Sequence, residues 1–256
     1  MKKIISLAIM AITLLPSATM AQEKFEASLS ADLVSRYMWR GLDLAGISLQ
    51  PNVSIAWQGL SLAANASTGF EKDDLQYIDV TLGYSRWGFN IGVTDYYTFN
   101  VDSKNRYFYF GDGLECAHQL EANIGYTCKY GSIQAYTMVY GNDYKINGDR
   151  AYSTYVELSI PFRAGGLDWD VRAGITPMES AGYSYEEKIT TDDGRTKTVT
   201  RGDWFYGESF TCNLASVRAT KNLTFKSFRV PVFVELHANP YLQRANLILG
   251  VSISTL

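Results

Sequence analysis

The stretch SADLVSRYMWRGLDL, residues 30–44, decides the fold because it alternates side chains that lipid accepts with side chains that need water. Tyr37 and Trp39 share one phase of the alternation, and Arg36 and Arg40 share the other. Successive side chains of an extended strand point to opposite faces. The stretch therefore predicts one strand, with Tyr37 and Trp39 pointing outward and both arginines pointing into water.

The same alternation recurs along almost the whole chain after residue 25. It is typical of strands that have an apolar environment on one face only. The tenth segment loses its phase after Leu214, which predicts a β-bulge. The twelve segments are 25–40, 47–58, 60–70, 78–84, 89–94, 119–126, 132–140, 154–162, 167–176, 205–219, 228–237 and 246–254.

Short and long connections alternate between these segments, and both chain ends fall on the side of the short ones. This layout predicts an all-β fold, namely a single transmembrane antiparallel up-and-down β-barrel of about twelve strands. Its short turns would be periplasmic and its longer loops extracellular, and Asp193-Gly194 predicts a hairpin within the longest loop. The short connections are 58–59, 86–88, 129–131, 163–166 and Lys221-Asn222, and the long ones are 42–46, 71–74, 100–117, 141–151, 177–204 and 239–243.

A soluble barrel or sandwich also alternates, with its apolar face inside, so a second observation has to decide which face is wet. About eight strands already enclose an interior that side chains fill, and twelve with an apolar interior would leave a void. Aromatic residues also gather near segment ends on the apolar phase, as in the girdles of membrane barrels. Both observations favour lipid outside and water inside. The predicted girdle residues are Tyr37, Trp39, Trp57, Phe70, Tyr84, Phe89, Phe162, Trp169 and Phe205.

Short motifs near both ends of the barrel resemble one family of proteins. Residues 35–41, SRYMWRG, resemble the S-D-Y-x-x-R-G start of TorF-type outer-membrane porins. Residues 229–235, RVPVFVE, and 249–252, LGVS, resemble the end of related barrels from Bacteroidota-like bacteria. Arg36 stands where the family has an acidic residue, and Leu256 stands where such barrels end in an aromatic residue. The resemblance implies passive transport through a barrel, without indicating the solute.

Charged and polar side chains on the second phase predict a wet lumen of mixed charge, which would select among small polar solutes. The alternative for each of them is a structural pair across the barrel wall. A symmetric turn at 163–166, for example, would place Glu157 opposite Arg172. The predicted pore needs no cofactor and no metal ion. The predicted pore-lining residues are Asp32, Arg36, Arg40, Asp79, Glu121, Glu157, Asp168, Asp170, Arg172, Arg229, Glu235 and His237.

Two other functions remain open for such a barrel. Bulky side chains on the lumen phase, such as Tyr155, Phe233 and Met38, would help to plug it and leave a non-conducting scaffold for a partner protein. A lipid-modifying hydrolase would need a histidine that activates a serine on the same face. Neither His118 nor His237 is followed two residues later by a serine. We therefore expect no enzyme and no catalytic residue, with His118 on the outward phase at the loop end.

The start of the chain predicts export from the cell. Lys2 and Lys3 precede a short apolar run and a small residue, Ala21, which is the pattern of a signal peptide. We predict a signal peptide over residues 1–21 and a barrel over residues 22–256, located in the outer membrane of a bacterium. Loss of two lysines takes the net charge from −3 to about −5. That charge argues against nucleic acid, so the expected partners are membrane lipids, lipopolysaccharide and small polar solutes.

Overall fold

The computed structural model describes residues 25–72, 74–99, 107–110, 117–190, 196–225 and 228–254. The predicted signal peptide and the predicted Asp193-Gly194 turn lie outside these residues. Within the described ranges, helices that could cross a membrane by their length and hydropathy are absent.

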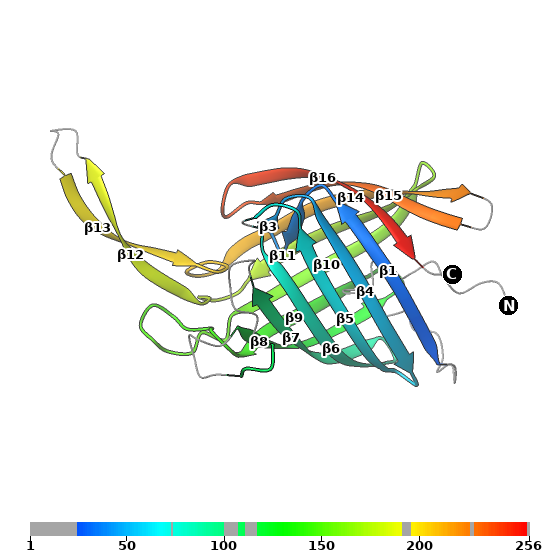
Figure 1. Cartoon of the computed structure of the whole chain (residues 1–256), viewed down its shortest axis with the longest axis horizontal. Coiled ribbons are helices and arrows are strands. Elements are labelled where there is room, and N and C mark those ends of the chain that lie inside the picture. Colours follow the sequence, from blue (N-terminus) through cyan, green and yellow to red (C-terminus); the bar gives the residue numbers. More distant parts are fainter. Residues whose placement is uncertain are drawn as a thin grey trace.

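In the described part of the chain, twelve antiparallel strands close into one barrel, which confirms the predicted fold class and strand number (Figure 1). Each barrel strand pairs with the next one along the chain, and β1 (Glu26–Val34) pairs with β16 (Arg244–Ser254) to close the ring. Every barrel strand therefore has a hydrogen-bonded neighbour on both sides, so the barrel has no free sheet edge. The remaining barrel strands are β4 (Ser48–Trp57), β5 (Leu60–Gly69), β6 (Gln76–Arg86), β7 (Phe89–Phe99), β8 (His118–Cys128), β9 (Gly131–Tyr140), β10 (Thr154–Ala164), β11 (Leu167–Thr176), β14 (Thr211–Phe225) and β15 (Phe228–Asn239).

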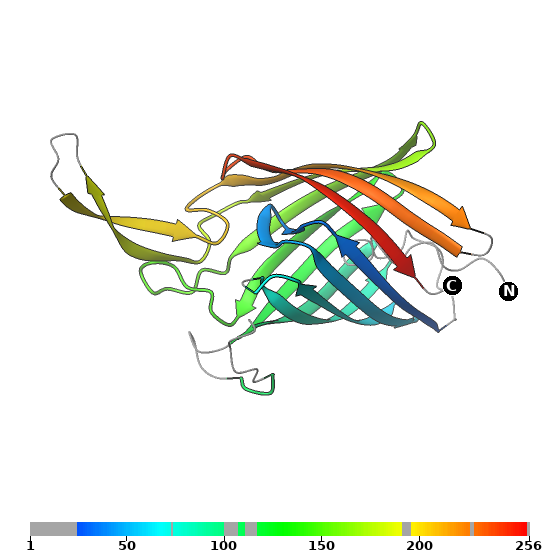
Figure 2. The ribbon, with the colours of Figure 1, turned by 45° about the horizontal axis from the view of Figure 1, so that its top comes forward.

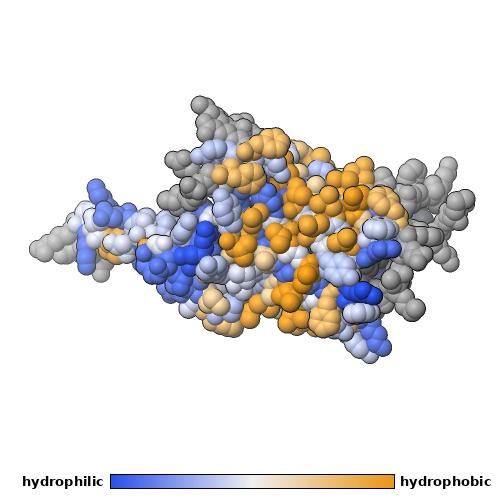
Figure 3. Space-filling model, turned by 90° about the horizontal axis from the view of Figure 1, so that it is seen from below, coloured by the Kyte–Doolittle hydropathy of each residue, from blue (hydrophilic) through white to orange (hydrophobic). Residues whose placement is uncertain are grey.

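The barrel wall is apolar outside and polar inside. On β7, for example, Ile91 is 55 % exposed whereas Thr94 is 8 % exposed. Figure 3 shows the resulting apolar surface over the barrel wall, which gives way to hydrophilic residues toward the projecting end of the molecule. Among the described residues, buried apolar side chains form two clusters inside the ring, one around Phe233 and one around Tyr155. Alternation therefore separates two environments, as predicted.

Most of the short turns have the geometry that their sequences predict. Gln58 and Gly59 both have positive φ angles, of 50° and 89°, as a two-residue type I′ hairpin turn requires. The turn predicted at Lys221-Asn222 is wrong, because β14 continues to Phe225 and β15 begins at Phe228. Asn222 stays in the ladder opposite Pro231, and its side-chain amide donates to Asp168 at 2.7 Å. These contacts extend the strand pair beyond the residues whose composition suggests a turn.

The predicted first strand is two elements, which is the main correction to the sequence analysis. β1 ends at Val34, and residues 37–45 form a separate hairpin of β2 (Tyr37–Trp39) and β3 (Leu42–Ala45). This hairpin is not part of the barrel ladder. It turns inward at the mouth of the barrel (Figure 2), so the prediction that Tyr37 and Trp39 point outward is wrong.

A second hairpin, β12 (Gly182–Thr190) and β13 (Thr196–Trp204), occupies the loop predicted over 177–204. It projects away from the barrel at the end opposite the two termini (Figure 1). The predicted bulge in the tenth segment is also present, since the register of β11 with β14 shifts between Gly174 and Ile175. Asn213 is the additional residue on β14, because its neighbours Cys212 and Leu214 pair with Ile175 and Gly174.

Apart from Tyr37, Trp39 and Phe205, the aromatic girdle agrees with the prediction. Phe205 lies in the connection between β13 and β14 and packs on Trp39 at a centroid distance of 5.9 Å. Trp57, Phe89 and Phe162 are 51 %, 62 % and 46 % exposed, and all three lie beside the short turns. Cross-strand ring pairs support them, with Phe162 stacked on Trp169 at a centroid distance of 6.0 Å. Phe70 is 63 % exposed at the opposite end. Aromatic side chains therefore mark both ends of the apolar wall.

We expect Gly59→Ala to destabilise the barrel more than Gly148→Ala. Both glycines have a φ of 89°, but an added Cβ at Gly59 would lie 2.5 Å from the Ser85 carbonyl oxygen, whereas nothing lies within 4 Å at Gly148. The strained φ costs both variants about 1 kcal/mol, and the clash adds to the first variant only. Urea unfolding in detergent micelles measures both free energies. Equal losses would contradict the steric explanation.

Candidate functional site

The inward β2–β3 hairpin, residues 37–45, is fixed at its base by the chain on either side of it. The Ser35 backbone N–H donates to the Leu249 carbonyl at 2.8 Å, and the Leu249 N–H donates to the Ser35 hydroxyl at 2.9 Å. On the other side, the Gly46 N–H donates to the Asp74 carboxylate at 2.9 Å. Arg36 pairs with Asp43 across the hairpin. The chain is therefore held at the points where it leaves and rejoins the barrel wall.

The tip of the β2–β3 hairpin is a two-residue turn that docks on β14 and β15. Arg40 and Gly41 have φ angles of 51° and 86°, the left-handed pair of a type I′ turn. An added Cβ at Gly41 would lie 1.9 Å from the Asn213 carbonyl oxygen, so only glycine fits this contact. The Gly41 N–H donates to His237 Nε2 at 3.1 Å, and its carbonyl accepts from the Asn239 amide at 3.2 Å.

These contacts define the protonation of His237. Because a backbone N–H can only donate, His237 Nε2 is an unprotonated acceptor. The proton of the neutral ring therefore lies on Nδ1, which donates to Glu235 at 2.9 Å. Glu235 is 1 % exposed and His237 2 %. The hairpin tip is thus attached through one histidine to a buried carboxylate.

The Arg40 side chain occupies the other half of the docking site. Its Nη1 and Nη2 atoms bind the two carboxylate oxygens of Glu121 on β8, at 2.6 and 2.8 Å. The Tyr206 hydroxyl accepts a further hydrogen bond from Nη1 at 2.9 Å. Burial raises the pKa of the Tyr206 phenol, which lies between β13 and β14, so it remains neutral and can accept. Tyr136 and Tyr155 place their rings 4.0 and 5.0 Å from the guanidinium carbon.

A second ionic cluster lines the lumen on the opposite wall. Glu235 on β15 binds Arg172 of β11 at 2.5 Å and Arg218 of β14 at 2.6 Å. Asp170 lies 3.3 Å from Arg172 and accepts a hydrogen bond from Ser159 at 2.6 Å. The charges of this wall therefore largely compensate one another. Buried ions keep their charge only when they are paired in this way.

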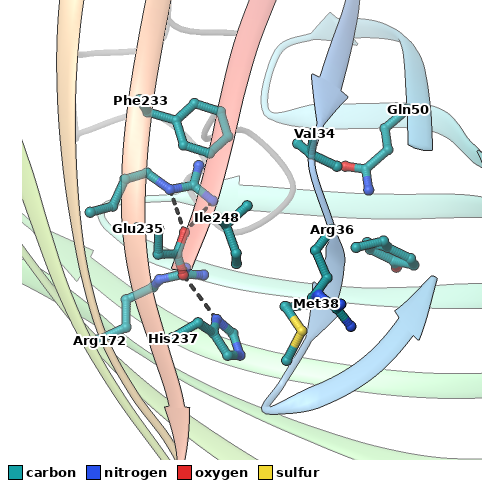
Figure 4. Close-up of a pocket in the computed structure, with 11 residues that line it drawn as sticks. Val34, Arg36, Met38, Gln50, Arg172, Phe233, Glu235, His237 and Ile248 are labelled. Atoms are coloured by element: carbon teal, nitrogen blue, oxygen red, sulfur yellow. Dashed lines mark hydrogen bonds and ion pairs between the residues drawn. The ribbon is translucent and has the colours of Figure 1, made fainter. Parts of the chain in front are cut away.

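A cavity of about 60 Å³ separates the hairpin from the second cluster. By the same measure a water needs about 10–15 Å³, so the cavity holds a few waters. Figure 4 shows Arg172, Glu235 and His237 on one side of it and Arg36 and Met38 on the other. The cavity is the space that remains where the hairpin does not touch the wall. The hairpin therefore narrows the lumen at this level.

The predicted pore-lining residues have four outcomes. Asp32, Asp79, Glu121, Glu157, Asp170, Arg172, Glu235 and His237 lie on the lumen phase of barrel strands. Arg36 and Arg40 lie before and on the inward hairpin rather than on the wall, because β1 ends at Val34. Asp168 is near a short turn and pairs with Arg163 at 3.0 Å. The side chain of Arg229 lies outside the described part of the structure.

The predicted Glu157–Arg172 cross-strand pair is wrong. Arg172 lies opposite Ser159, and Glu157 lies opposite Gly174, because the turn closes on Gly165 and Gly166. Glu157 instead accepts a hydrogen bond from the Tyr155 hydroxyl at 2.8 Å. The general alternative of structural pairing is nevertheless confirmed for most of the lumen charges.

Sequence reasoning missed several members of the site. Arg218 follows the β14 bulge, where the alternation no longer shows which face a residue occupies. Tyr136 lies in a segment whose phase is ambiguous, and the structure places it on the lumen face at 9 % exposure. Tyr206 falls in the predicted tenth segment, 205–219, but the start of that segment is wrong, because β14 begins at Thr211 and Tyr206 belongs to the connection before it. Only its aromatic character beside β14 would have suggested a buried position.

His118 lies on the outward phase of β8, as predicted. Its Nδ1 is 3.0 Å from Asp95, and its Nε2 is 2.5 Å from the Tyr107 carbonyl oxygen. Phe110 stacks on the imidazole at 4.0 Å, and the side chain is fully buried. Both ring nitrogens are engaged in these contacts, which give His118 a role in anchoring the covering loop.

Comparisons with known proteins do not assign the chain. No model of a known protein family matches it, and no curated protein sequence is significantly similar to it. The resemblance to TorF-type porins stays a prediction. The function is therefore inferred from the geometry of the lumen.

We expect Glu121→Gln to lower the free energy of unfolding by about 3–5 kcal/mol, since it leaves the buried Arg40 guanidinium without its counter-charge. The matched control is Asp168→Asn, which breaks an ion pair whose side chains are 77 % and 45 % exposed. Exposed pairs contribute below about 1 kcal/mol. Urea titrations of both refolded variants measure the difference. Losses of similar size would show that Arg40 is not held mainly by Glu121.

Proposed function

We propose that the protein is a bacterial outer-membrane channel through which small polar solutes diffuse passively, and that the β2–β3 hairpin closes it in this structure. One observation carries the proposal: large apolar side chains cover the outside of the barrel, while carboxylates and guanidinium groups are buried inside it. A water-soluble barrel has the opposite arrangement. The fold itself, a closed antiparallel barrel, is compatible with such a channel.

The physical reason is the solvent on each side of the wall. Lipid offers no partners for backbone N–H and C=O groups, and a closed barrel satisfies all of them within its own ladder. Leu62, Leu82 and Ile91 are 44–59 % exposed on the outer face, where contact with lipid tails would remove them from water. Exposed apolar surface of this extent marks a binding face or a membrane face on a protein. Aromatic residues at both ends support a membrane position.

The inner face supports passage of polar solutes rather than storage of apolar ones. Asn65 donates to Asp79 at 2.7 Å, and Thr81 and Thr94 are in hydrogen-bond contact at 2.9 Å. These groups replace part of the hydration of a polar solute. The ionic clusters around Glu121 and Glu235 carry both signs of charge. Size and mixed charge would therefore filter solutes, without a cofactor.

A non-conducting scaffold is the second candidate, because side chains and the hairpin fill part of the lumen. Tyr155 is 0 % and Phe233 4 % exposed, and Met38 packs against the Phe233 cluster. Burial of these three side chains supports the plug that the sequence predicts. A channel requires that the hairpin can leave its docked position inside the barrel, whereas a scaffold does not. Under both candidate functions, the protein would be exported through the predicted signal peptide and inserted into a membrane that contains lipopolysaccharide.

The barrel should be heat-modifiable on a detergent gel. Unheated protein is expected to migrate differently from boiled protein, because detergent does not open a ring in which every barrel strand is paired on both sides. Electrophoresis of refolded protein with and without boiling measures this. Identical migration would contradict a stable closed barrel.

Removal of the β2–β3 hairpin should increase single-channel conductance. Val34 and Ser48 are paired neighbours, so a Gly-Ser link of about four residues can replace residues 37–45. We expect rare or small current steps from the wild-type protein in a planar bilayer and larger, sustained steps from this variant. Shortening the β12–β13 hairpin, which projects away from the barrel, is the matched control and should leave the current unchanged. A folded but silent variant would favour the scaffold.

A further inference from the structure

The Arg40 guanidinium is bound by a carboxylate, a hydroxyl and aromatic rings, which are the groups with which proteins bind free organic cations. Glu121 binds it with two parallel hydrogen bonds, and the Tyr206 hydroxyl accepts a third. Tyr136 and Tyr155 present ring faces at 4.0 and 5.0 Å, within the range of cation–π attraction. These four partners come from β8, β9, β10 and the connection before β14, and the hairpin itself adds the Trp39 ring at 4.4 Å from the guanidinium carbon. The hairpin thus contributes the cation and one ring, and the rest of the chain contributes the carboxylate, the hydroxyl and the other two rings.

We propose that this Arg40 seat is a binding site for organic cations of the guanidinium type, and that Arg40 occupies it as an internal ligand. The seat consists of Glu121 with the rings of Tyr136, Tyr155 and Tyr206. Glu121 and Tyr206 are each 2 % exposed, so a cation bound there is largely removed from water. Removal from water strengthens both the charge-assisted hydrogen bonds and the cation–π contacts.

The geometry of the seat distinguishes guanidinium from other cations. A planar fork matches both oxygens of one carboxylate, which a compact ammonium group cannot do with two parallel bonds. Stacked tyrosine rings also favour a flat, weakly hydrated cation over a strongly hydrated one. Within the described residues, groups of three or more His, Cys, Asp or Glu side chains that could hold a metal ion are absent. The chemistry of the seat therefore favours an organic cation.

A free cation would have to compete with Arg40 for Glu121. Arg40 is delivered by a short hairpin, and such tethers give effective concentrations in the millimolar range. The hairpin tip is also hydrogen-bonded to His237 and Asn239, which adds to the binding that a competing cation has to overcome. A competing solute is therefore expected to act at about millimolar concentration or above. That its binding opens the channel rests on the proposed function, whereas the binding itself does not.

The test is calorimetric titration of refolded protein with methylguanidinium. We expect Arg40→Ala, which empties the seat, to bind it at least about tenfold more tightly than the wild-type protein does. Methylammonium should bind this variant more weakly. Arg163→Ala is the matched control, because Arg163 is an exposed arginine paired with Asp168 at a short turn, and it should bind no better than the wild type.

A double variant, Arg40→Ala with Glu121→Gln, separates the seat from other carboxylates. It also avoids an unpaired buried charge, so it should fold even if the single variant is unstable. Loss of methylguanidinium binding in the double variant supports the proposal. Equal binding to heat-modifiable single and double variants, or no binding to either, overturns it.

The wild-type protein gives an independent measurement. Methylguanidinium should accelerate hydrogen exchange of the Gly41 amide, which is released from His237 when the tip undocks. Methylammonium at the same concentration should have a smaller effect, and unchanged exchange with both cations contradicts competition at the seat. A hairpin-deleted variant that stays silent in bilayers, together with a wild-type protein that shows these binding effects, would overturn the proposed channel and leave the cation site standing.

Discussion

A ring of twelve strands encloses more space than the side chains of its own wall can fill, and the rest of the structure follows from this constraint. The space must hold water, another part of the chain, or both. Here residues 37–45 enter it, and charged wall residues meet their partners on or beside this segment. A soluble barrel would fill its interior with side chains such as leucine and valine, which this chain places on the outside of the wall.

Much of the barrel could be predicted from the sequence, because alternation is a local property with a fixed period. Leu29 and Leu33 are exposed, whereas Ser30 and Val34 are buried, as their phases indicate. The inward hairpin could not be predicted in this way. Residues 37–40 continue the alternation of β1 although they lie on a different element, since a strand that leaves the wall keeps its period of two. Where the chain leaves the wall, Ser35 is hydrogen-bonded to Leu249, on a strand at the far end of the sequence.

The sequence predicts which charged residues of the candidate site face the lumen, but it does not predict which residues pair with them. Glu121, Glu235 and His237 fall on the lumen phase by simple counting. Their ligands, Arg40 and Arg218, come from a turn and from a strand beyond a bulge, where counting fails. The same lumen charges that suggested an open, wet pore are mostly neutralised by neighbours. In the proposed channel, passage of solutes would therefore depend on how firmly the hairpin is docked rather than on the sign of any single residue.

The location of the hairpin's partners also constrains the order of assembly. Gly41 is 196 residues from His237 in the sequence, and Arg40 is 81 residues from Glu121. The hairpin is among the first elements of the chain, yet its seat does not exist until β8, β10 and β15 stand in the same ring. Contacts between residues this far apart in the sequence form late in folding because closing long loops is entropically costly. The hairpin can therefore dock only once these strands have come together, so its docking is coupled to assembly of the wall that receives it.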